Sequence, residues 1–246
     1  MEYTRRVYRY WHRQDDLAHF NITCRETDLD IGIQREKLTS DLISQTRDLV
    51  RHERARLEEY LVRDPGFLSS LEPYQALPGA PDIARSMAVA AGKAGVGPMA
   101  AVAGAFAELV GRWLTKFSGE VAVENGGDIY LRTGKKRRIG VFAARSPFSN
   151  RIALLIKPHQ TPLGICTSSG SVGHSLSFGQ ADAMVVLAPS VILADAVATA
   201  SANLVKTPAD LEKAVNYALG IAGVTGALAI MGDRLAVRGE VELVPS

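Results

Sequence analysis

The sequence predicts an α+β fold, in which helices pack on mainly antiparallel or mixed sheets. Two observations support this prediction. Short apolar stretches with strand-like alternation occur in groups, and helical stretches separate the groups. A layered arrangement lets each element bury its apolar face against another layer. No fixed-period repeat and no low-complexity tract is found. The length of 246 residues suits one large or two small domains, and we expect a single domain over residues 1–246.

The N-terminal subregion, residues 1–80, is expected to contain strands followed by one long helix. Polar and apolar residues alternate there in two or three antiparallel strands, near residues 7–11, 20–24 and 29–33. The clearest helix of the chain extends over about residues 39–62 and has an apolar stripe along one side. Asp64-Pro65-Gly66 ends this helix, and the prolines and glycines that follow predict a connector up to residue 80.

The remaining part, residues 81–246, is expected to carry the functional site. Helices are predicted at residues 81–94, 98–117, 191–204 and 208–219. Strands are predicted near residues 119–123, 128–132, 138–143, 151–156, 163–166, 182–188, 224–230 and 233–238. The helix that begins at Pro98 is rich in alanine and glycine, so we expect another element to pack very close to it.

Composition and charge argue against several classes of protein. The chain has 28 Lys and Arg against 26 Asp and Glu, which is too balanced to predict nucleic-acid binding. The basic run at residues 135–138 lies between two predicted strands and is interpreted as a solvated hairpin tip. No apolar run approaches the roughly 20 residues of a membrane helix, and no signal peptide is recognised. With only Cys24 and Cys166, we expect a cytoplasmic protein without membrane partners.

Asn125-Gly126-Gly127-Asp128 follows an apolar strand and has two interpretations. Asn-Gly between alternating strands is one of the strongest signals for a hairpin turn. In the functional interpretation, the glycines let the backbone approach a ligand and present N–H groups to a phosphate or a base. Asp128 would supply an acceptor at the same point. The sequence leaves both interpretations open.

A second stretch, residues 164–175, leads from an apolar strand into a loop rich in hydroxyl groups and glycines. Such a loop presents several N–H and O–H donors to oxyanions, although a flexible Ser/Gly loop has the same composition. The candidate donors are Thr167, Ser168, Ser169 and Gly170. His174 in this loop could act as an acid or a base near neutral pH, or simply form a structural hydrogen bond.

Asp195 and Thr199 lie one turn apart on one face of a helix that is otherwise apolar. A carboxylate among such neighbours is costly unless it is hydrogen-bonded or bound to a cation. One acid and one hydroxyl suit Mg²⁺, which usually keeps waters and takes further oxygens from substrate phosphates. The structural alternative is that Asp195 caps a neighbouring loop.

The order of these three segments resembles the ApbE-like superfamily, which includes the flavin transferases that split FAD with magnesium and attach FMN to a protein threonine. The likeness covers about residues 85–205. Its most specific parts are Asn-Gly-Gly-Asp at 125–128 and Ala-Asp-x-x-x-Thr at 194–199. The resemblance implies an ApbE-like layered fold with a flavin nucleotide pocket. By this resemblance, residues 125–128 and 167–170 line the pocket, Asp195 and Thr199 bind Mg²⁺, and His174 is catalytic.

Two departures from the transferases distinguish this sequence. Residues 97–104 lack the lysine of their glycine-alanine-lysine-glycine element, and residues 175–179 replace their Asp-Pro-x-Thr-Gly element. The chain therefore looks like a shorter, cytoplasmic branch of the superfamily. A ligand pocket survives these losses better than the transfer chemistry does.

Three functions remain open at this stage. The first is a magnesium-dependent enzyme that acts on FAD or a related pyrophosphate. The second is a non-catalytic protein that binds a flavin or another nucleotide. The third is thiol chemistry at Cys166 in sulfide assimilation or homocysteine synthesis, because a neighbouring donor-rich loop favours a thiolate. A buried Cys is more often a small apolar residue. The long helix at residues 39–62 could also pack on a second copy in a homodimer.

Overall fold

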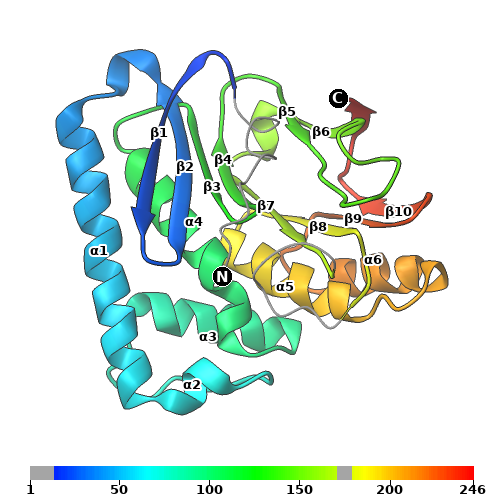
Figure 1. Cartoon of the computed structure of the whole chain (residues 1–246), viewed down its shortest axis with the longest axis horizontal. Coiled ribbons are helices and arrows are strands. Elements are labelled where there is room, and N and C mark those ends of the chain that lie inside the picture. The colour runs from blue at the N-terminus through cyan, green and yellow to red at the C-terminus, as the bar shows by residue number, and fades with distance from the viewer. Residues whose placement is uncertain (1–13, 171–178) are drawn as a thin grey trace.

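The computed structural model describes residues 14–170 and 179–246 of the chain. His174 and the strand predicted near residues 7–11 lie outside these described residues. A large sheet forms the centre of the molecule, with helices on one face and a small second sheet on the other (Figure 1). The predicted α+β layered fold is therefore confirmed.

The large sheet has eight strands in the order β1-β2-β3-β4-β7-β8-β9-β10, and all neighbouring strands are antiparallel. Its strands are β1 (Leu17–Cys24), β2 (Thr27–Gln34), β3 (Val121–Asn125), β4 (Asp128–Arg132), β7 (Leu163–Ser168), β8 (Ala183–Ala188), β9 (Gly226–Met231) and β10 (Arg234–Gly239). The chain leaves this sheet between β4 and β7 to form two strands of the second sheet, whose order is β11-β6-β5. These strands are β5 (Arg137–Gly140), β6 (Ile152–Ile156) and β11 (Leu243–Pro245).

The helices largely follow the predicted positions. They are α1 (Ser40–Arg63), α2 (Pro65–Ser69), α3 (Asp82–Ala94), α4 (Val102–Leu114), α5 (Val191–Asn203) and α6 (Leu211–Gly220). Short 3₁₀ turns lie at Arg35–Lys37, Pro98–Ala101, Pro158–Gln160 and Pro208–Asp210. The predicted helix at 98–117 thus begins as a 3₁₀ turn at Pro98–Ala101, and its α-helical part ends at Leu114. The short helix α2 and strand β11 were not predicted.

A two-residue turn joins β3 and β4. Asn125 pairs with Asp128 across the ladder, which leaves Gly126 and Gly127 as the two turn residues. Their φ angles of +67° and +107° lie in the region that glycine adopts without strain. The hairpin interpretation of this stretch is therefore confirmed.

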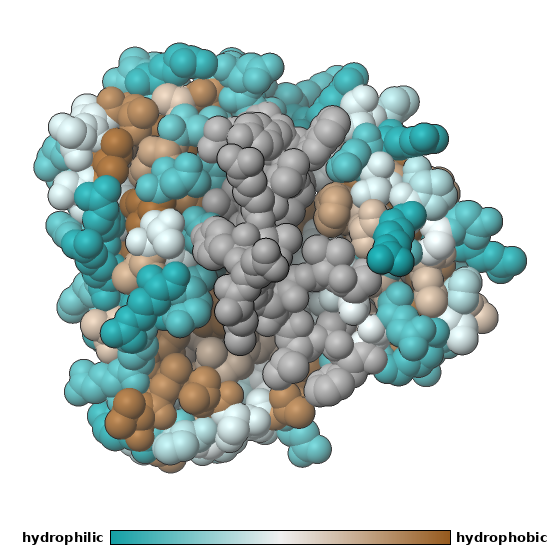
Figure 2. All heavy atoms as spheres, in the orientation of Figure 1, coloured by the Kyte–Doolittle hydropathy of each residue, from teal (hydrophilic) through white to brown (hydrophobic). Residues whose placement is uncertain are grey.

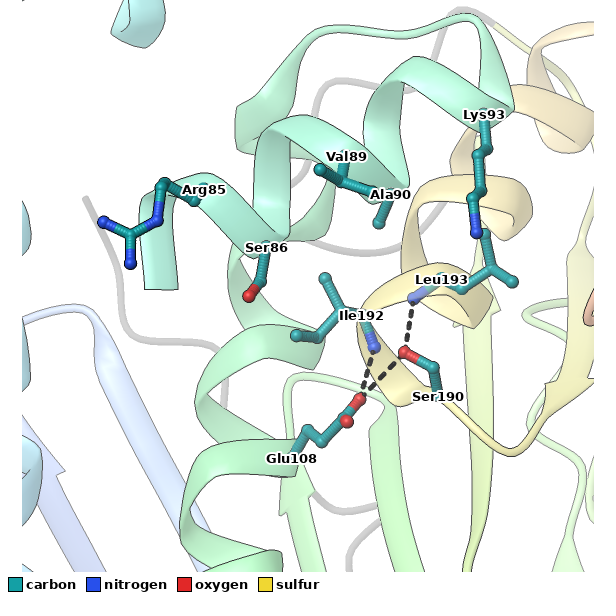
Figure 3. Close-up of a pocket in the computed structure, with 9 residues that line it drawn as sticks. All are labelled: Arg85, Ser86, Val89, Ala90, Lys93, Glu108, Ser190, Ile192 and Leu193. Carbon is teal, nitrogen blue, oxygen red and sulfur yellow. Dashed lines mark hydrogen bonds between the residues drawn. The ribbon is translucent and has the colours of Figure 1, made fainter. Parts of the chain in front are cut away.

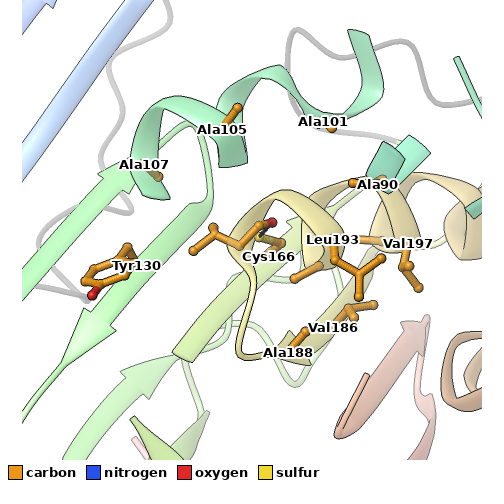
Figure 4. Close-up of a cluster of buried hydrophobic side chains, with 14 of the residues drawn as sticks. Ala90, Ala101, Ala105, Ala107, Tyr130, Cys166, Val186, Ala188, Leu193 and Val197 are labelled. Carbon is orange, nitrogen blue, oxygen red and sulfur yellow. Dashed lines mark hydrogen bonds between the residues drawn. The ribbon is translucent and has the colours of Figure 1, made fainter. Parts of the chain in front are cut away.

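Alternation along the strands gives the large sheet two different apolar faces. On one face, Tyr130 and Cys166 pack with helices α4 and α5 in the larger core (Figure 4). On the other face, Ile129 and Ile165 join a smaller core beneath the second sheet. Because Asp128 shares the helix-facing side with Tyr130, the sheet directs its carboxyl group toward α4 and α5.

The structure corrects part of the interpretation of residues 135–138 as a solvated hairpin tip: Lys135, Lys136 and Arg138 are exposed, but the segment is not a hairpin and Arg137 is buried. These residues connect two different sheets, since β4 belongs to the large sheet and β5 to the small one. Arg137 is buried and forms ion pairs with Asp16 and Glu120. Lys135 contacts the same Asp16 at 3.1 Å. The basic run therefore ties the second sheet to the first, because a buried guanidinium requires charged partners.

The corner formed by the end of α1, α2 and the following connector exposes several large apolar side chains. They are Val62, Leu68, Leu71 and Leu77. Apolar residues gather at this corner in the space-filling view, where Figure 1 places α2 (Figure 2). Among the described helices, none is by itself both long and apolar enough for a membrane span, whereas α3 and the Pro98–Leu114 segment pass that test as a pair bent by 103°.

We predict that Gly164 is required for the close contact between β7 and the start of α5. An added Cβ at Gly164 would lie 2.6 Å from the Cα of Val191, which is backbone and cannot move aside easily. Gly164→Ala should therefore lower the free energy of unfolding by about 1–3 kcal/mol in urea denaturation. Gly92→Ala in α3 is the matched control, because nothing lies within 4 Å of its added Cβ. Equal stability of the two variants would contradict the prediction.

Candidate functional site

Helix α5 carries Asp195 and Thr199, and both side chains are nearly buried, with 9% and 8% exposure. Ser190 caps the N-terminus of this helix, because its hydroxyl accepts a hydrogen bond from the N–H of Leu193. Apart from Asp195, its buried residues are apolar or carry a hydroxyl group. The carboxylate is thus held inside the protein by a helix that packs along the sheet.

Asp195 accepts a hydrogen bond from the first turn of α4. Its Oδ2 lies 2.8 Å from the backbone nitrogen of Gly104, and the Ala103 N–H also interacts with this carboxyl. The residue preceding α4, Ala101, has no side chain that could cap the helix. Only glycine fits at position 104, since an added Cβ would lie 2.7 Å from the Cβ of Asp195. Asp195 therefore acts as a cap, as in the structural alternative, but it caps the N-terminus of helix α4 and not a loop.

A second carboxyl group, that of Asp128, lies close to Asp195. Asp128 begins β4 and pairs in register with Cys166 of β7, whose thiol interacts with its side chain. Burial raises the pKa of Asp128 well above its usual range, and the charge of Asp195 raises it further. Burial also raises the pKa of Asp195 to about 7, opposed by the hydrogen bonds from Gly104 and Ala103. Two desolvated carboxyl groups thus lie close enough to interact electrostatically between the sheet and the helices.

The β3–β4 turn and the end of β7 lie next to this pair of carboxyl groups. The Asn125 side chain donates to the Ala103 carbonyl at 3.0 Å, and the N–H of Gly127 donates to Glu124 at 2.9 Å. An added Cβ at Gly127 would lie 3.5 Å from the Thr167 carbonyl. Within the described residues, the hydroxyl of Ser168 is buried and has no hydrogen-bond partner. Such an orphaned hydroxyl is uncommon in a protein interior and fits a ligand contact.

The other predicted pocket residues lie farther along the chain. Ser169 and Gly170 follow the end of β7, and both donate to the Ala181 carbonyl, at 3.5 Å and 2.9 Å. The structure therefore brings together residues 125–128, residues 166–168 and Asp195. Thr199 follows on the same helix, while His174 lies outside the described residues.

Cys166 does not have the environment of a reactive thiolate. Its Sγ is fully buried and donates to the Val191 carbonyl at 3.4 Å. Burial raises the pKa of the thiol well above its usual value, and the nearby charges of Asp128 and Asp195 raise it further. The expectation of a thiolate at this position is wrong, because no cation offsets the two acids there within the described part of the chain.

The sequence did not single out Gly104 or Glu108 of α4. Glu108 is buried and lies on the same face as Gly104, one turn later. It belongs to the lining of a groove of about 500 Å³ between α3 and the start of α5 (Figure 3). The one available signal was the excess of alanine and glycine in α4, which correctly indicated a close neighbour but did not identify it.

The donors at the site fit a hard cation better than a zinc ion. In residues 14–170 and 179–246, no group of three or more His, Cys, Asp or Glu side chains is arranged to hold a metal. Mg²⁺ does not need such a group, because it is commonly bound through one or two carboxylates, waters and the phosphates of a substrate. A divalent cation would also offset the unfavourable burial of Asp128 and Asp195.

Comparison with known proteins identifies the family of this chain. A family model described as AbpE bacteria matches residues 9–234. The chain belongs to this ApbE-like family. Among its relatives, a UPF0280 protein of Methanocella arvoryzae is 43% identical over 195 residues, covering 79% of each chain. A UPF0280 protein of Methanospirillum hungatei is 46% identical over 196 residues, covering 78% of this chain and 77% of the relative.

Solved structures of ApbE proteins have the same fold. The flavin transferase ApbE from Vibrio cholerae superposes with a TM-score of 0.62 at 15% identity, covering 91% of this chain and 96% of its own. The ApbE protein of Thermotoga maritima superposes with a TM-score of 0.55 at 13% identity, covering 91% of this chain and 97% of its own. The resemblance to the ApbE-like superfamily stated from the sequence is therefore confirmed at the level of family and fold.

We predict that the metal-free protein loses stability as the pH rises toward neutrality. The folded-state pKa of Asp195 lies near 7, above the unfolded value of 3.8, so the stabilising proton is present below pH 4 and lost as the pH rises through 7. The free energy of unfolding should fall by up to about 1.4 kcal/mol per pH unit within this window. Asp195→Asn should remove the part of this slope that Asp195 contributes and leave the part due to Asp128, whose pKa is raised mainly by its own burial, in thermal melts between pH 5 and 8. A wild-type melting temperature that is constant over this range would contradict the prediction.

We predict that the two cysteines react very differently with a thiol reagent. Cys24 is partly exposed at the end of β1, whereas Cys166 is buried and its thiol pKa is raised. Native protein treated with a disulfide reagent at pH 8 should be labelled at Cys24 and resist labelling at Cys166 by at least tenfold in rate. Unfolding in guanidinium chloride should make both thiols reactive. Rapid native labelling of Cys166 would contradict its burial.

Proposed function

We propose that this protein binds a flavin nucleotide, FAD or FMN, or a related pyrophosphate, together with Mg²⁺. The observation that carries the proposal is the buried pair of carboxyl groups of Asp128 and Asp195 beside the first turn of α4. Two such groups are unfavourable in isolation and become favourable next to a divalent cation. The Vibrio cholerae protein with a similar fold is a flavin transferase, which supports the choice of ligand.

Each group at the site has a role in this proposal. Asp195 and Thr199 hold the cation, and the bound cation would neutralise charge on the oxygens of a pyrophosphate. The orphaned hydroxyl of Ser168 is placed to donate to a phosphate oxygen. At Gly126, apart from its own chain neighbours, no atom of residues 14–170 or 179–246 lies within 4 Å of an added Cβ, which leaves room for the nucleotide. Thr167, Ser169 and Gly170 complete the proposed lining, together with Asn125 and Gly127.

A binding function is favoured over group transfer. Residues 97–104 contain no lysine or arginine, and Pro98 and Ala101 of the 3₁₀ turn are buried. This stretch therefore brings no cationic side chain to a phosphate. His174 remains a predicted proton carrier for the alternative, a magnesium-dependent enzyme that cleaves FAD. A non-catalytic nucleotide-binding protein is the second candidate. The absence of a lysine or arginine side chain from residues 97–104 favours it over the enzyme.

We propose that residues 1–246 form a single domain, with the site carried by residues 81–246. A homodimer and a cytoplasmic location stay predictions from the sequence. The proposed partner is a small nucleotide ligand, without nucleic acid.

Calorimetric titration with FAD, with and without Mg²⁺, tests the proposed function. We expect binding that Mg²⁺ strengthens by at least tenfold, equivalent to about 1.4 kcal/mol. Asp195→Asn should abolish this Mg²⁺ dependence while keeping an acceptor for the Gly104 N–H. Asp233→Asn in the exposed β9–β10 turn is the matched control and should bind like the wild type.

The outcomes separate the candidates. Release of AMP and FMN from FAD and Mg²⁺, measured by chromatography, would favour the enzyme over the binding protein. The proposed function is wrong if FAD, FMN and ADP each give no heat of binding and no shift of the melting temperature in the presence of Mg²⁺.

A further inference from the structure

Glu108 forms hydrogen bonds to the start of the helix that carries Asp195. Its Oε2 accepts from the backbone nitrogen of Ile192 at 3.1 Å and from the Ser190 hydroxyl at 3.0 Å (Figure 3). Its Oε1 accepts from the Arg112 side chain at 2.7 Å and 2.6 Å. The carboxylate is only 6% exposed, so all of these contacts are made largely away from water.

The two helices are joined by reciprocal capping. Asp195 of α5 accepts from the first turn of α4, and Glu108 of α4 accepts from the first turn of α5. Each N-terminus has orphaned N–H groups and a partial positive charge, so a carboxylate from the opposite helix stabilises it. On α4 the two contact points, Gly104 and Glu108, are four residues apart. On α5, Ile192 and Asp195 are three residues apart, so both contacts lie along one seam.

These contacts add directional constraints to the packing of α5. The helix is already buried against β7, β8 and α3. The two hydrogen-bonded contacts, one turn apart and in the opposite sense, specify which turn of α5 lies beside the start of α4. Ser190 alone cannot replace Glu108, because its hydroxyl already accepts from Leu193 and leaves the Ile192 N–H for the carboxylate.

We propose that Glu108 is a positioning residue that keeps the Asp195 carboxyl group beside the first turn of α4, where it would bind the cation. This inference rests on the proposed function, since Asp195 is the cation ligand assigned there. Arg112 acts differently, because its side chain is 66% exposed and, within residues 14–170 and 179–246, forms its hydrogen bonds with the other oxygen of Glu108 on the same helix. Glu108 lines the groove, and within residues 14–170 and 179–246 its side chain bonds to Ser190, Ile192 and Arg112 and not to Asp195 or Thr199.

Amide hydrogen exchange followed by NMR tests this role without any ligand. The Gly104 N–H reports the bond to Asp195 directly, and the Ile192 N–H reports the bond to Glu108. In Glu108→Ala we expect both amides to exchange at least tenfold faster. The amide of Val123, in the buried strand β3, should be unchanged and thereby exclude global destabilisation.

A graded series of variants keeps the test decisive. Glu108→Gln retains one acceptor for the Ile192 N–H and should give an intermediate exchange rate at Gly104. This variant carries the test if Glu108→Ala folds poorly. Arg112→Gln leaves the Oε2 contacts in place and is the matched control, with little change at Gly104. The Mg²⁺-dependent gain in FAD affinity should follow the same order, falling by about tenfold in Glu108→Ala and less in Glu108→Gln.

The outcomes are distinct. Faster exchange at Ile192 with unchanged Gly104 would make Glu108 a local cap of α5 and overturn the proposal. Unchanged exchange at both amides would overturn it as well. A wild-type protein that binds no FAD with Mg²⁺ would overturn the proposed function instead, while the Gly104 exchange rate would still decide whether Glu108 positions Asp195.

Discussion

The desolvation of carboxylates along the α4–α5 seam is the constraint on which the site depends. Buried acids are unfavourable unless N–H donors, hydroxyl groups or cations surround them. In this protein two helix N-termini provide the donors, because Asp195 accepts from the start of α4 and Glu108 from the start of α5. The two carboxyl groups cap the helix N-termini, and the N–H groups of those N-termini offset the cost of burying the carboxyl groups.

The large sheet adds the second half of the site. Its antiparallel register places Asp128 opposite Cys166, on the face that the helices cover. The two turn residues before Asp128 are glycines, so no side chain projects from the backbone there. Gly164 allows α5 to begin close to β7. The polar groups are therefore positioned by backbone contacts, and the apolar core on both faces of the sheet keeps that backbone in place.

Local patterns in the sequence were sufficient for most of the fold. Alternation predicted the strands, the apolar stripe predicted α1, and the Asn-Gly pair predicted the turn at Gly126. The crossover of residues 133–137 between two sheets was missed, because the burial of Arg137 depends on Asp16 and Glu120 far away in the chain. The same reason explains Glu108, because Ser190 and Ile192, its partners at the start of α5, are more than 80 residues away. Family resemblance supplied the roles of the site residues, which periodicity alone could not.

Reciprocal capping also affects how the chain folds. The bond between Gly104 and Asp195 closes a loop of 91 residues, so the first turn of α4 has no cap until the chain beyond β8 is in place. On a ribosome, α4 emerges long before α5, and its N-terminus remains open to water in the meantime. Long loops of this kind slow folding, because their closure entropy is lost before the contact forms. The two helices should therefore consolidate together, as a late and cooperative step in folding.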